Sequence, residues 1–501
     1  MGNRVHGAVV CCFFMLLGAC QKSNDHVAET PRAVVDECEN DTDDCDTNAT
    51  CTDRLDGFTC ACNEGYTGNG IVCVVRPQAP TAYSPHRFKN DPRLLGWRGG
   101  SNMVVTVDGT EPVENSTQYN NDTFLILPSE QDTVTVKSKV LGTEAGNLSD
   151  ASTLQVTFYY VNSASVVSTE DGSISAPFKT ITSAVTAANV NASNTHWYRI
   201  LVASGDYAGN ITLSKAVSLF GSGSTAILNG RLTVNGESRT AHTVVNGLRI
   251  TGQVVIEENA SMLFAHNVID YETTEVLTIL NVYGSGSEIV RNHVNVTTTN
   301  DTNSTTGIYL QENSGDTLIF GNHIAITGNW SLHGIRMSAS TTPKIINNTI
   351  DVSNGSVLWT DQSDAKVQNN DLFGNVWVAC RSRNDDCVYP LLNHNRHEKG
   401  DYDASFYLLE SWYDGNDSKF DQSTDTFPFY LVGGIFDSPY NNTWRQTCLA
   451  GPQSSPCIDT MGLNLSSEYP GATDLRGVKR SPSGGELETG WSTGAYEWDS
   501  D

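Results

Sequence analysis

Hydrophobic and polar positions alternate along most of the chain, and between residues 244 and 372 this alternation is organised into a repeat. An asparagine followed two places later by an aliphatic residue recurs at Asn246, Asn267, Asn292, Asn322, Asn348 and Asn370. The intervals are 21, 25, 30, 26 and 22 residues, and a period of this length is typical of a solenoid. Because the segments are β-branched and alternate with period two, the repeat unit is made of strands.

One coil holding two or three short strands predicts a parallel β-helix. We expect each asparagine amide to donate to the asparagine of the next coil and to accept from the previous one, because parallel strands lie about 4.8 Å apart. The aliphatic residue two places later should fill the lumen, at Leu248, Ile269, Val294, Ile324, Ile350 and Leu372. This ladder indicates an architecture and says little about chemistry.

The segment before the repeat predicts a cap for the first coil. Ile181, Ala184, Val185 and Ala188 share one face of a helix, which would cover the apolar lumen and the unpaired strand edge. The run from Asp171 to Val185, with the strands that follow, resembles the entry of exported right-handed parallel β-helix proteins of the pectate-lyase-like superfamily. The resemblance implies a right-handed parallel β-helix over residues 161–380, with about seven or eight coils between Arg199 and Val378.

Residues 80–160 show short alternating runs at 103–108, 123–127, 133–140 and 154–160, which predict a small β-sandwich. The run from Val105 to Pro112 resembles the Ig-like module at the ends of bacterial chitobiases and other surface enzymes. That resemblance implies a spacer. We expect Trp97 to pack in its core, and stacking on a sugar is the alternative.

Composition narrows the possible partners. The 501 residues carry a formal net charge of −27, with 30 Lys and Arg against 57 Asp and Glu, so nucleic acid is not expected as a partner. Met1–Cys20 has a basic start, a short apolar run and a small-residue ending, which predict an export signal. The ending Leu17-Gly18-Ala19-Cys20 resembles a bacterial lipobox, which implies lipidation of Cys20, with an outer-membrane address and residues 21–35 as a tether. An ordinary signal peptide is the alternative.

Cysteine usage predicts disulfides. Of 13 cysteines, Cys11, Cys12 and Cys20 belong to the signal region, and six of the other ten crowd into residues 38–73. A segment this short cannot bury a sufficient core and needs covalent bridges. The late pairs Cys380/Cys387 and Cys448/Cys457 are expected to bridge locally; a zinc site is the alternative.

The first six cysteines resemble an EGF-like module of the calcium-binding subtype over residues 36–74. The resemblance implies the bridges Cys38–Cys51, Cys45–Cys60 and Cys62–Cys73. It also implies Ca²⁺ held by the Glu37 and Asp53 side chains and by carbonyl groups at Val35, Arg54 and Gly57. Val34 stands where the family usually has Asp or Asn, so Asp36 is a substitute candidate. An EGF-like module without metal is the alternative.

Enzymes on β-helices use clustered carboxylates, or Ca²⁺ with a basic residue, in a cleft on one face. His293 and His323 follow ladder asparagines and are expected to stack outward, and Asp270 and Asp351 could line up, but no acid–base pair emerges. Trp330 and Trp359 are candidate sugar platforms on turns. Residues 381–501 are expected to cap the last coil, and their closing motifs resemble those of exported β-helix proteins, in which Asp459, Asp474 and Arg480 would pair structurally.

These observations favour a surface-anchored lipoprotein that binds an extracellular polysaccharide or other glycan, with calcium as the cofactor of its EGF-like module. A polysaccharide lyase or glycoside hydrolase and a structural surface protein are the alternatives. Anchored modules would lift the solenoid from the membrane, and long polar faces suit extended glycans.

Overall fold

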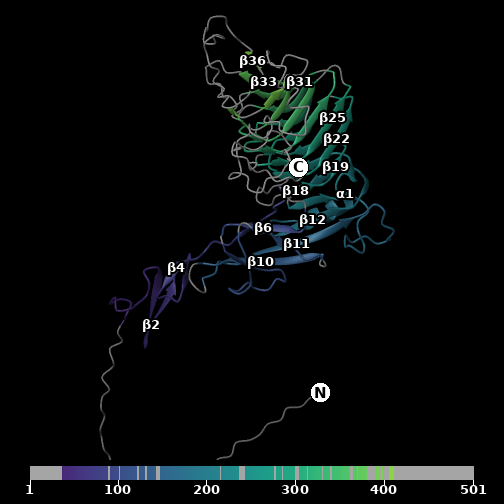
Figure 1. The fold of residues 1–501 in the computed structure, drawn as a ribbon. Helices are drawn as coiled ribbons and strands as arrows, with labels where there is room; N and C mark the ends of the chain where they lie inside the picture. Colours follow the sequence, from purple (N-terminus) through teal and green to yellow (C-terminus); the bar gives the residue numbers. More distant parts are fainter. Residues whose placement is uncertain are drawn as a thin grey trace, which may run out of the picture. The chain divides into compact units, whose positions relative to one another are not determined.

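The computed structural model describes residues 36–380 except 88–90, 101, 121–122, 130–131, 143–146, 215, 236–242, 276–277, 285, 300–303, 313, 330, 339–340, 362–364 and 369, together with 391–393, 396–398 and 406–410. The fold is mainly β and contains one helix within these residues (Figure 1). The chain divides into two compact units, Met1–Arg76 and Pro77–Asp501. No helix among the described residues is long and apolar enough to cross a membrane.

The first unit is held together by disulfides. Strands β1 (Ala49–Arg54) and β2 (Gly57–Cys62) form an antiparallel hairpin, and β3 (Tyr66–Gly68) pairs with β4 (Cys73–Val75). The bridges are Cys38–Cys51, Cys45–Cys60 and Cys62–Cys73, and the expected pairing is therefore confirmed.

The second unit begins with two small sheets that enclose a core. One contains β5 (Thr81–Tyr83), β6 (Leu94–Arg98) and β9 (Leu125–Ile126), and the other begins with β8 (Thr117–Tyr119), β7 (Met103–Thr106), β10 (Thr133–Val140) and β11 (Ser152–Val161). Trp97 packs in this core at 2% exposure, and its indole N–H donates to Ser138 Oγ at 3.1 Å. Strand β11 then pairs in parallel with the first strand of the solenoid, so one sheet runs from the sandwich into the coils.

Three parallel ladders build the solenoid. The first ladder contains β12 (His196–Val202), β15 (Val217–Gly221), β18 (Thr243–Asn246), β21 (Met262–Ala265), β24 (Glu288–Val290), β27 (Leu318–Phe320), β30 (Lys344–Ile346), β32 (Lys366–Gln368) and β34 (Leu391–Asn393). The second contains β13 (Gly205–Ala208), β16 (Ala226–Asn229), β19 (Arg249–Ile250), β22 (Val268–Thr273), β25 (His293–Thr298) and β28 (His323–Thr327). The third contains β14 (Ile211–Leu213), β17 (Leu232–Val234), β20 (Val254–Ile256), β23 (Thr278–Val282), β26 (Thr305–Leu310) and β29 (Leu332–Met337).

The second and third ladders merge in the later coils. The long strands β31 (Thr349–Asp361) and β33 (Asp371–Cys380) continue both ladders, and β35 (Arg396–Glu398) and β36 (Phe406–Glu410) pair with β33. Eight first-ladder strands, β12 to β32, precede β33 in the described chain, which matches the expected seven or eight coils.

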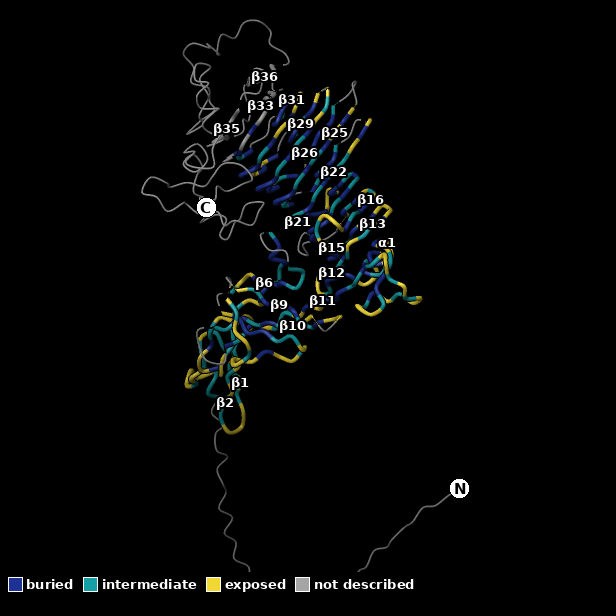
Figure 2. The backbone as a smooth tube through the Cα atoms, turned by 45° about the vertical axis from the view of Figure 1, so that its right-hand side comes forward, coloured by how far each residue is buried: buried dark blue, intermediate teal, exposed yellow. Residues whose placement is uncertain are grey.

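Helix α1 (Ile181–Asn191) covers the first coil. Thr180 caps its first turn by accepting a hydrogen bond from the Ser183 N–H, and the buried face is Ile181, Ala184, Val185 and Ala188, as predicted. The lumen behind it is apolar through every coil. Its first-ladder column, Ile200, Leu219, Val245, Phe264, Ile289, Ile319 and Ile345, is 0% exposed, and Figure 2 shows the buried strands in dark blue.

The asparagine ladder forms at the turn between the first and second ladders. The Nδ2 atoms of Asn292, Asn322 and Asn348 each donate to the Oδ1 of the next asparagine at 2.9 Å, and Asn267 donates to Asn292 at 3.2 Å. Each Nδ2 also donates to a backbone carbonyl of the preceding coil, so these buried amides are fully bonded. The aliphatic residues Ile269, Val294, Ile324, Ile350 and Leu372 are in register and buried, as expected.

The first copy of the repeat was aligned wrongly. Asn246 pairs with Ala265, and Ile250 rather than Leu248 pairs with Ile269, so the copy is displaced by two residues. Leu248 instead offers its N–H to Asn267 Oδ1 at 3.0 Å. The residues before Asn267, Asn292, Asn322 and Asn348 have a left-handed backbone, and in the first copy the corresponding residue is Gly247 at φ +70°.

Candidate functional site

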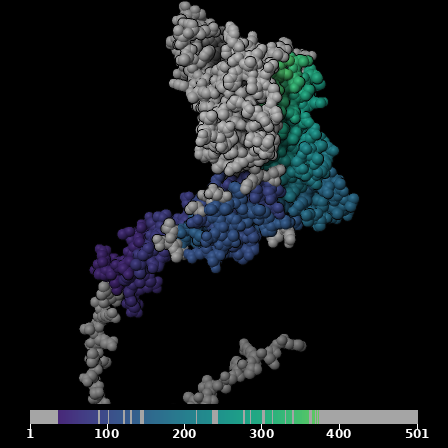
Figure 3. Space-filling view, viewed as in Figure 1, coloured from purple at the N-terminus to yellow at the C-terminus, as the bar shows by residue number. Residues whose placement is uncertain are grey.

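The most distinctive outward surface lies on the third ladder. Asn281, Tyr309, Arg336 and Trp359 are register partners on β23, β26, β29 and β31. The residues just before them in the chain, Leu280, Ile308, Ile335 and Leu358, are buried in the lumen, so alternation turns this column outward. Figure 3 shows the described outer surface of the solenoid as a band from teal to green.

Arg336 is held between two aromatic rings. Its guanidinium carbon lies 4.8 Å from the ring centroid of Tyr309 and 4.1 Å from that of Trp359. Each such cation–π contact contributes about 0.5–1 kcal/mol at exposed sites. Within the described residues no carboxylate pairs with Arg336, so the rings position the cation and leave it available to a ligand.

His333 completes this surface. Its Nδ1 lies 2.7 Å from Ser356 Oγ, and its ring lies 4.7 Å from that of Trp359 at an angle of 30°. Burial lowers the pKa of His333 to about 4, and the charge of Arg336 acts in the same direction. The imidazole is therefore neutral at neutral pH and can exchange hydrogen bonds with hydroxyl groups.

We call Tyr309, His333, Arg336 and Trp359 the aromatic–arginine surface. It offers ring edges, a planar fork of N–H donors and a neutral imidazole, which are groups suited to a polyhydroxylated ligand. Glycoside hydrolysis usually requires two carboxylates about 5–9.5 Å apart, and this surface contains neither. Sequence reasoning found Trp359 but placed it on a turn; it lies in strand β31. Trp330 lies outside the described residues.

The second ladder carries the expected histidines. His293 and His323 are register partners with ring centroids 5.7 Å apart in an edge-to-face arrangement, which confirms the outward stack. Burial lowers the pKa of both imidazoles. Burial also raises the pKa of the Asp351 carboxyl, while His323 opposes that shift.

The two aspartates of this ladder do not form an acid–base pair. Asp270 and Asp351 share one register column, but Asn295 and Ala325 stand between them. Three steps of about 4.8 Å place their backbones roughly 14 Å apart. Asp270 instead forms an ion pair with Arg249.

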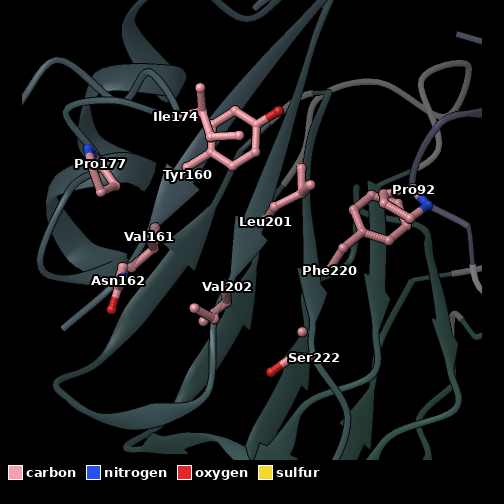
Figure 4. Close-up of a pocket in the computed structure, with 12 residues that line it drawn as sticks. Pro92, Tyr160, Val161, Asn162, Ile174, Pro177, Leu201, Val202, Phe220 and Ser222 are labelled. Atoms are coloured by element: carbon pink, nitrogen blue, oxygen red, sulfur yellow. The ribbon is translucent and has the colours of Figure 1, made fainter. Parts of the chain in front are cut away.

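A pocket of about 330 Å³ lies beside the first two coils of the solenoid (Figure 4). Its lining includes Tyr160, Phe220, Pro92, Pro177 and Ile174, and among the described residues no acid, histidine, lysine or arginine lines it. The pocket can hold an apolar group.

The Cys38–Cys51 disulfide links the two segments that carry Glu37 and Asp53, the side chains expected to hold calcium. Glu37 precedes Cys38 and Asp53 follows Cys51 by two places, and the bridge between those cysteines holds their Cα atoms 5.7 Å apart. Glu37 Oε2 and Asp53 Oδ1 are both buried and have no hydrogen-bond donor. Hard oxygen ligands lacking a partner fit a calcium ion.

The other residues expected to bind calcium differ in their surroundings. The carbonyl residues Arg54 and Gly57 pair at the end of the β1–β2 hairpin, next to Asp53. Asp36 Oδ1 accepts the Glu39 N–H at 3.0 Å, and Val35 lies outside the described residues. A second cluster of ligand-type atoms, Asp43 with Cys38 and Cys51, offers no thiolate because both sulfurs are in the disulfide.

Several expected sites fall outside the described residues. These are Cys20, Cys387, Cys448, Cys457, Asp459, Asp474 and Arg480. Cys380 ends β33, and only its backbone is described.

Comparison with known proteins adds one finding. A family model for the EGF domain matches residues 38–73. No curated protein and no solved structure matches the chain. The first unit therefore contains an EGF-like domain with three disulfides, which suggests an extracellular or exported protein. The match does not extend to the solenoid.

Proposed function

We propose that this chain is an exported protein that binds an extracellular glycan along the aromatic–arginine surface of its third ladder. The observation that carries the proposal is Arg336, which stacks between Tyr309 and Trp359 without a carboxylate partner among the described residues. Planar N–H donors fixed by rings match the hydroxyl pairs of sugars, and neighbouring coils repeat at about the spacing of successive sugar units.

The test is a glycan array probed with the chain and with Arg336→Ala and Trp359→Ala. We expect each variant to lose at least about tenfold in affinity for the glycans bound by the unchanged chain, because 1.4 kcal/mol corresponds to a factor of ten. Arg249→Ala on the second ladder is the matched control and should bind normally. Equal binding by all four proteins would refute the assignment, and release of reducing or unsaturated sugars would favour a hydrolase or lyase.

We also propose that Glu37 and Asp53 hold Ca²⁺ in the EGF-like module. Their buried oxygens without donors support this assignment. Calorimetric titration of the chain should show saturable heat that disappears in Asp53→Asn and persists in Asp43→Asn, whose carboxylate lies beside the Cys38–Cys51 disulfide. Absence of heat at millimolar calcium would exclude the site.

We further propose a lipid anchor at Cys20, on the lipobox resemblance. Labelling of growing cells with a fatty-acid probe should mark the chain, and Cys20→Ala should abolish both the label and recovery with membranes. A chain that remains unlabelled and is secreted would indicate an ordinary signal peptide.

A further inference from the structure

The segment between β5 and β6 lies against the outer face of the first ladder. The His86 ring lies 4.8 Å from that of Phe220 in β15, and the Arg87 guanidinium forms an ion pair with Glu288 in β24. The Pro92 carbonyl accepts a hydrogen bond from Arg199 Nη1 in β12. His86, Arg87 and Pro92 therefore contact first-ladder strands of several coils.

Several polar atoms under this segment have no partner. Arg199 Nη2, His86 Nδ1 and both side-chain polar atoms of Asn246 are buried without a hydrogen bond, and the three residues are 1%, 0% and 0% exposed. Phe220 links two of them, because its ring contacts His86 and its backbone pairs with Asn246, and the charge of Arg199 acts on His86. Buried polar groups are costly to leave unbonded, so several in one region indicate a ligand.

The charge of this cluster is positive. Arg199 Nη1 donates its hydrogen bond to a neutral carbonyl, and burial lowers the pKa of the guanidinium to about 9 while Asp91 opposes the shift. Asp91 itself is engaged by Arg93 at 3.3 Å. A buried charge needs a counter-charge, and among the described residues no carboxylate forms a salt bridge with the Arg199 guanidinium.

We propose that Arg199, Asn246 and His86 bind one small monovalent anion of the size of chloride, which joins the segment between β5 and β6 to the solenoid. The guanidinium Nη2 and the amide Nδ2 are the permanent donors. All three residues are buried, which favours a small anion over a large organic one.

His86 couples this site to protons. Its Nε2 lies 2.8 Å from the Asp91 carbonyl, so the neutral ring carries its hydrogen there and presents a bare lone pair at Nδ1. An anion repels that lone pair, whereas a proton on Nδ1 turns it into a third donor. Binding of the anion therefore takes up a proton and tightens as pH falls.

The groups that face His86 determine how readily its imidazole takes up a proton. Arg199 from β12 and His266 from the turn after β21 both oppose its protonation, and burial is the largest contribution. The Asp91 carbonyl on its own segment favours protonation. Nearby, Arg87 and Glu288 neutralise each other, and Arg291 acts on His266. A bound anion would offset the positive charge of Arg199 and so favour protonation of His86.

The test is thermal unfolding of the chain at constant ionic strength, with chloride replacing gluconate, at pH 8 and pH 5. We expect chloride to raise the melting midpoint saturably by several degrees, and more at pH 5 than at pH 8. Arg199→Met and Asn246→Leu should remove the chloride effect, and Arg98→Met, outside the cluster, should keep it. If Arg199→Met does not fold, the chloride effect on the melting midpoint is compared between Asn246→Leu and the unchanged chain.

Crystals soaked in bromide should show an anomalous peak beside Arg199. Equal midpoints in chloride and gluconate at both pH values would mean that the cluster holds water and would overturn the proposal. A chloride effect that survives in the folded cluster variants would indicate a general salt effect and would overturn it equally.

Discussion

Two asparagines in the same solenoid, Asn322 and Asn246, are both 0% exposed but differ in every other respect. Asn322 donates to Asn348 and to the Ile289 carbonyl and accepts from Asn292. Asn246, two residues out of register with that ladder, has no partner for either side-chain polar atom. The position in the coil, and not the residue type, therefore decides whether a buried asparagine amide forms hydrogen bonds within the fold or remains without partners.

The regions around these residues differ in the same way. The turn that carries Asn267 to Asn370 places an asparagine in every coil, and these asparagines hydrogen-bond to one another. The outer face of the first ladder near Asn246 changes from coil to coil and leaves buried polar atoms unbonded. Regular columns thus supply stability, and the irregular ones are where binding chemistry can be built.

The largest expected effect is the loss of folding stability when acid protonates His86 in the irregular region. Burial lowers the pKa of His86 from 6.5 to about 3, so its stabilising effect is complete above pH 6.5 and declines as pH falls towards 3. The full loss is on the order of 5 kcal/mol at 1.36 kcal/mol per pKa unit. The pH dependence of unfolding in chloride-free buffer measures this loss.

His86→Phe is the matched control, since it keeps a ring against Phe220 but cannot titrate. We expect its free energy of unfolding to depend less steeply on pH between 6 and 4, by up to about 1.4 kcal/mol per pH unit for one proton. Identical slopes in the two proteins would show that His86 is not buried in its neutral form.

Removing a rung should have the next largest effect. Asn322→Ala removes the hydrogen bonds that Asn292 donates to Asn322 and that Asn322 donates to Asn348 in a buried turn, which should lower stability by about 1–3 kcal/mol. Urea unfolding measures the change. An unchanged midpoint would refute the inward placement of this residue.

Asn246→Leu should have the opposite sign. Without chloride, replacing an amide that lacks partners by an apolar group of similar size should leave the melting midpoint unchanged or raise it, by up to about 1 kcal/mol of stability. A loss as large as that of Asn322→Ala would mean that Asn246 also makes strong hydrogen bonds, and the contrast between the two asparagines would fail.

The register of the later coils could be predicted because their asparagine recurs with an aliphatic residue two places on. The first copy misled because Asn246 also precedes such a residue by two places. Gly247 was the better guide: Gly321 occupies the corresponding left-handed position one residue before Asn322. Aligning these glycines would have placed Ile250, not Leu248, in the lumen column.

The two candidate binding regions could not be predicted in this way. Tyr309, Arg336 and Trp359 come together only through the register of three strands separated by loops of unequal length. Arg199 and Pro92 are 107 residues apart, and Arg87 and Glu288 are 201 apart. By contrast, the EGF-like module is short, and its resemblance to the EGF-like family implied the disulfide pairing that the structure has.

The smallest stability effect should come from the aromatic–arginine surface. Arg336→Gln removes two cation–π contacts but leaves Tyr309, Trp359 and the lumen in place, so the cost should be about 1 kcal/mol. Arg249→Gln, on the second ladder, is the control for loss of a surface arginine. Glycan affinity should fall at least about tenfold in Arg336→Gln and stay unchanged in the control. A large stability loss with unchanged binding would instead make this stack another structural column, like the asparagine ladder.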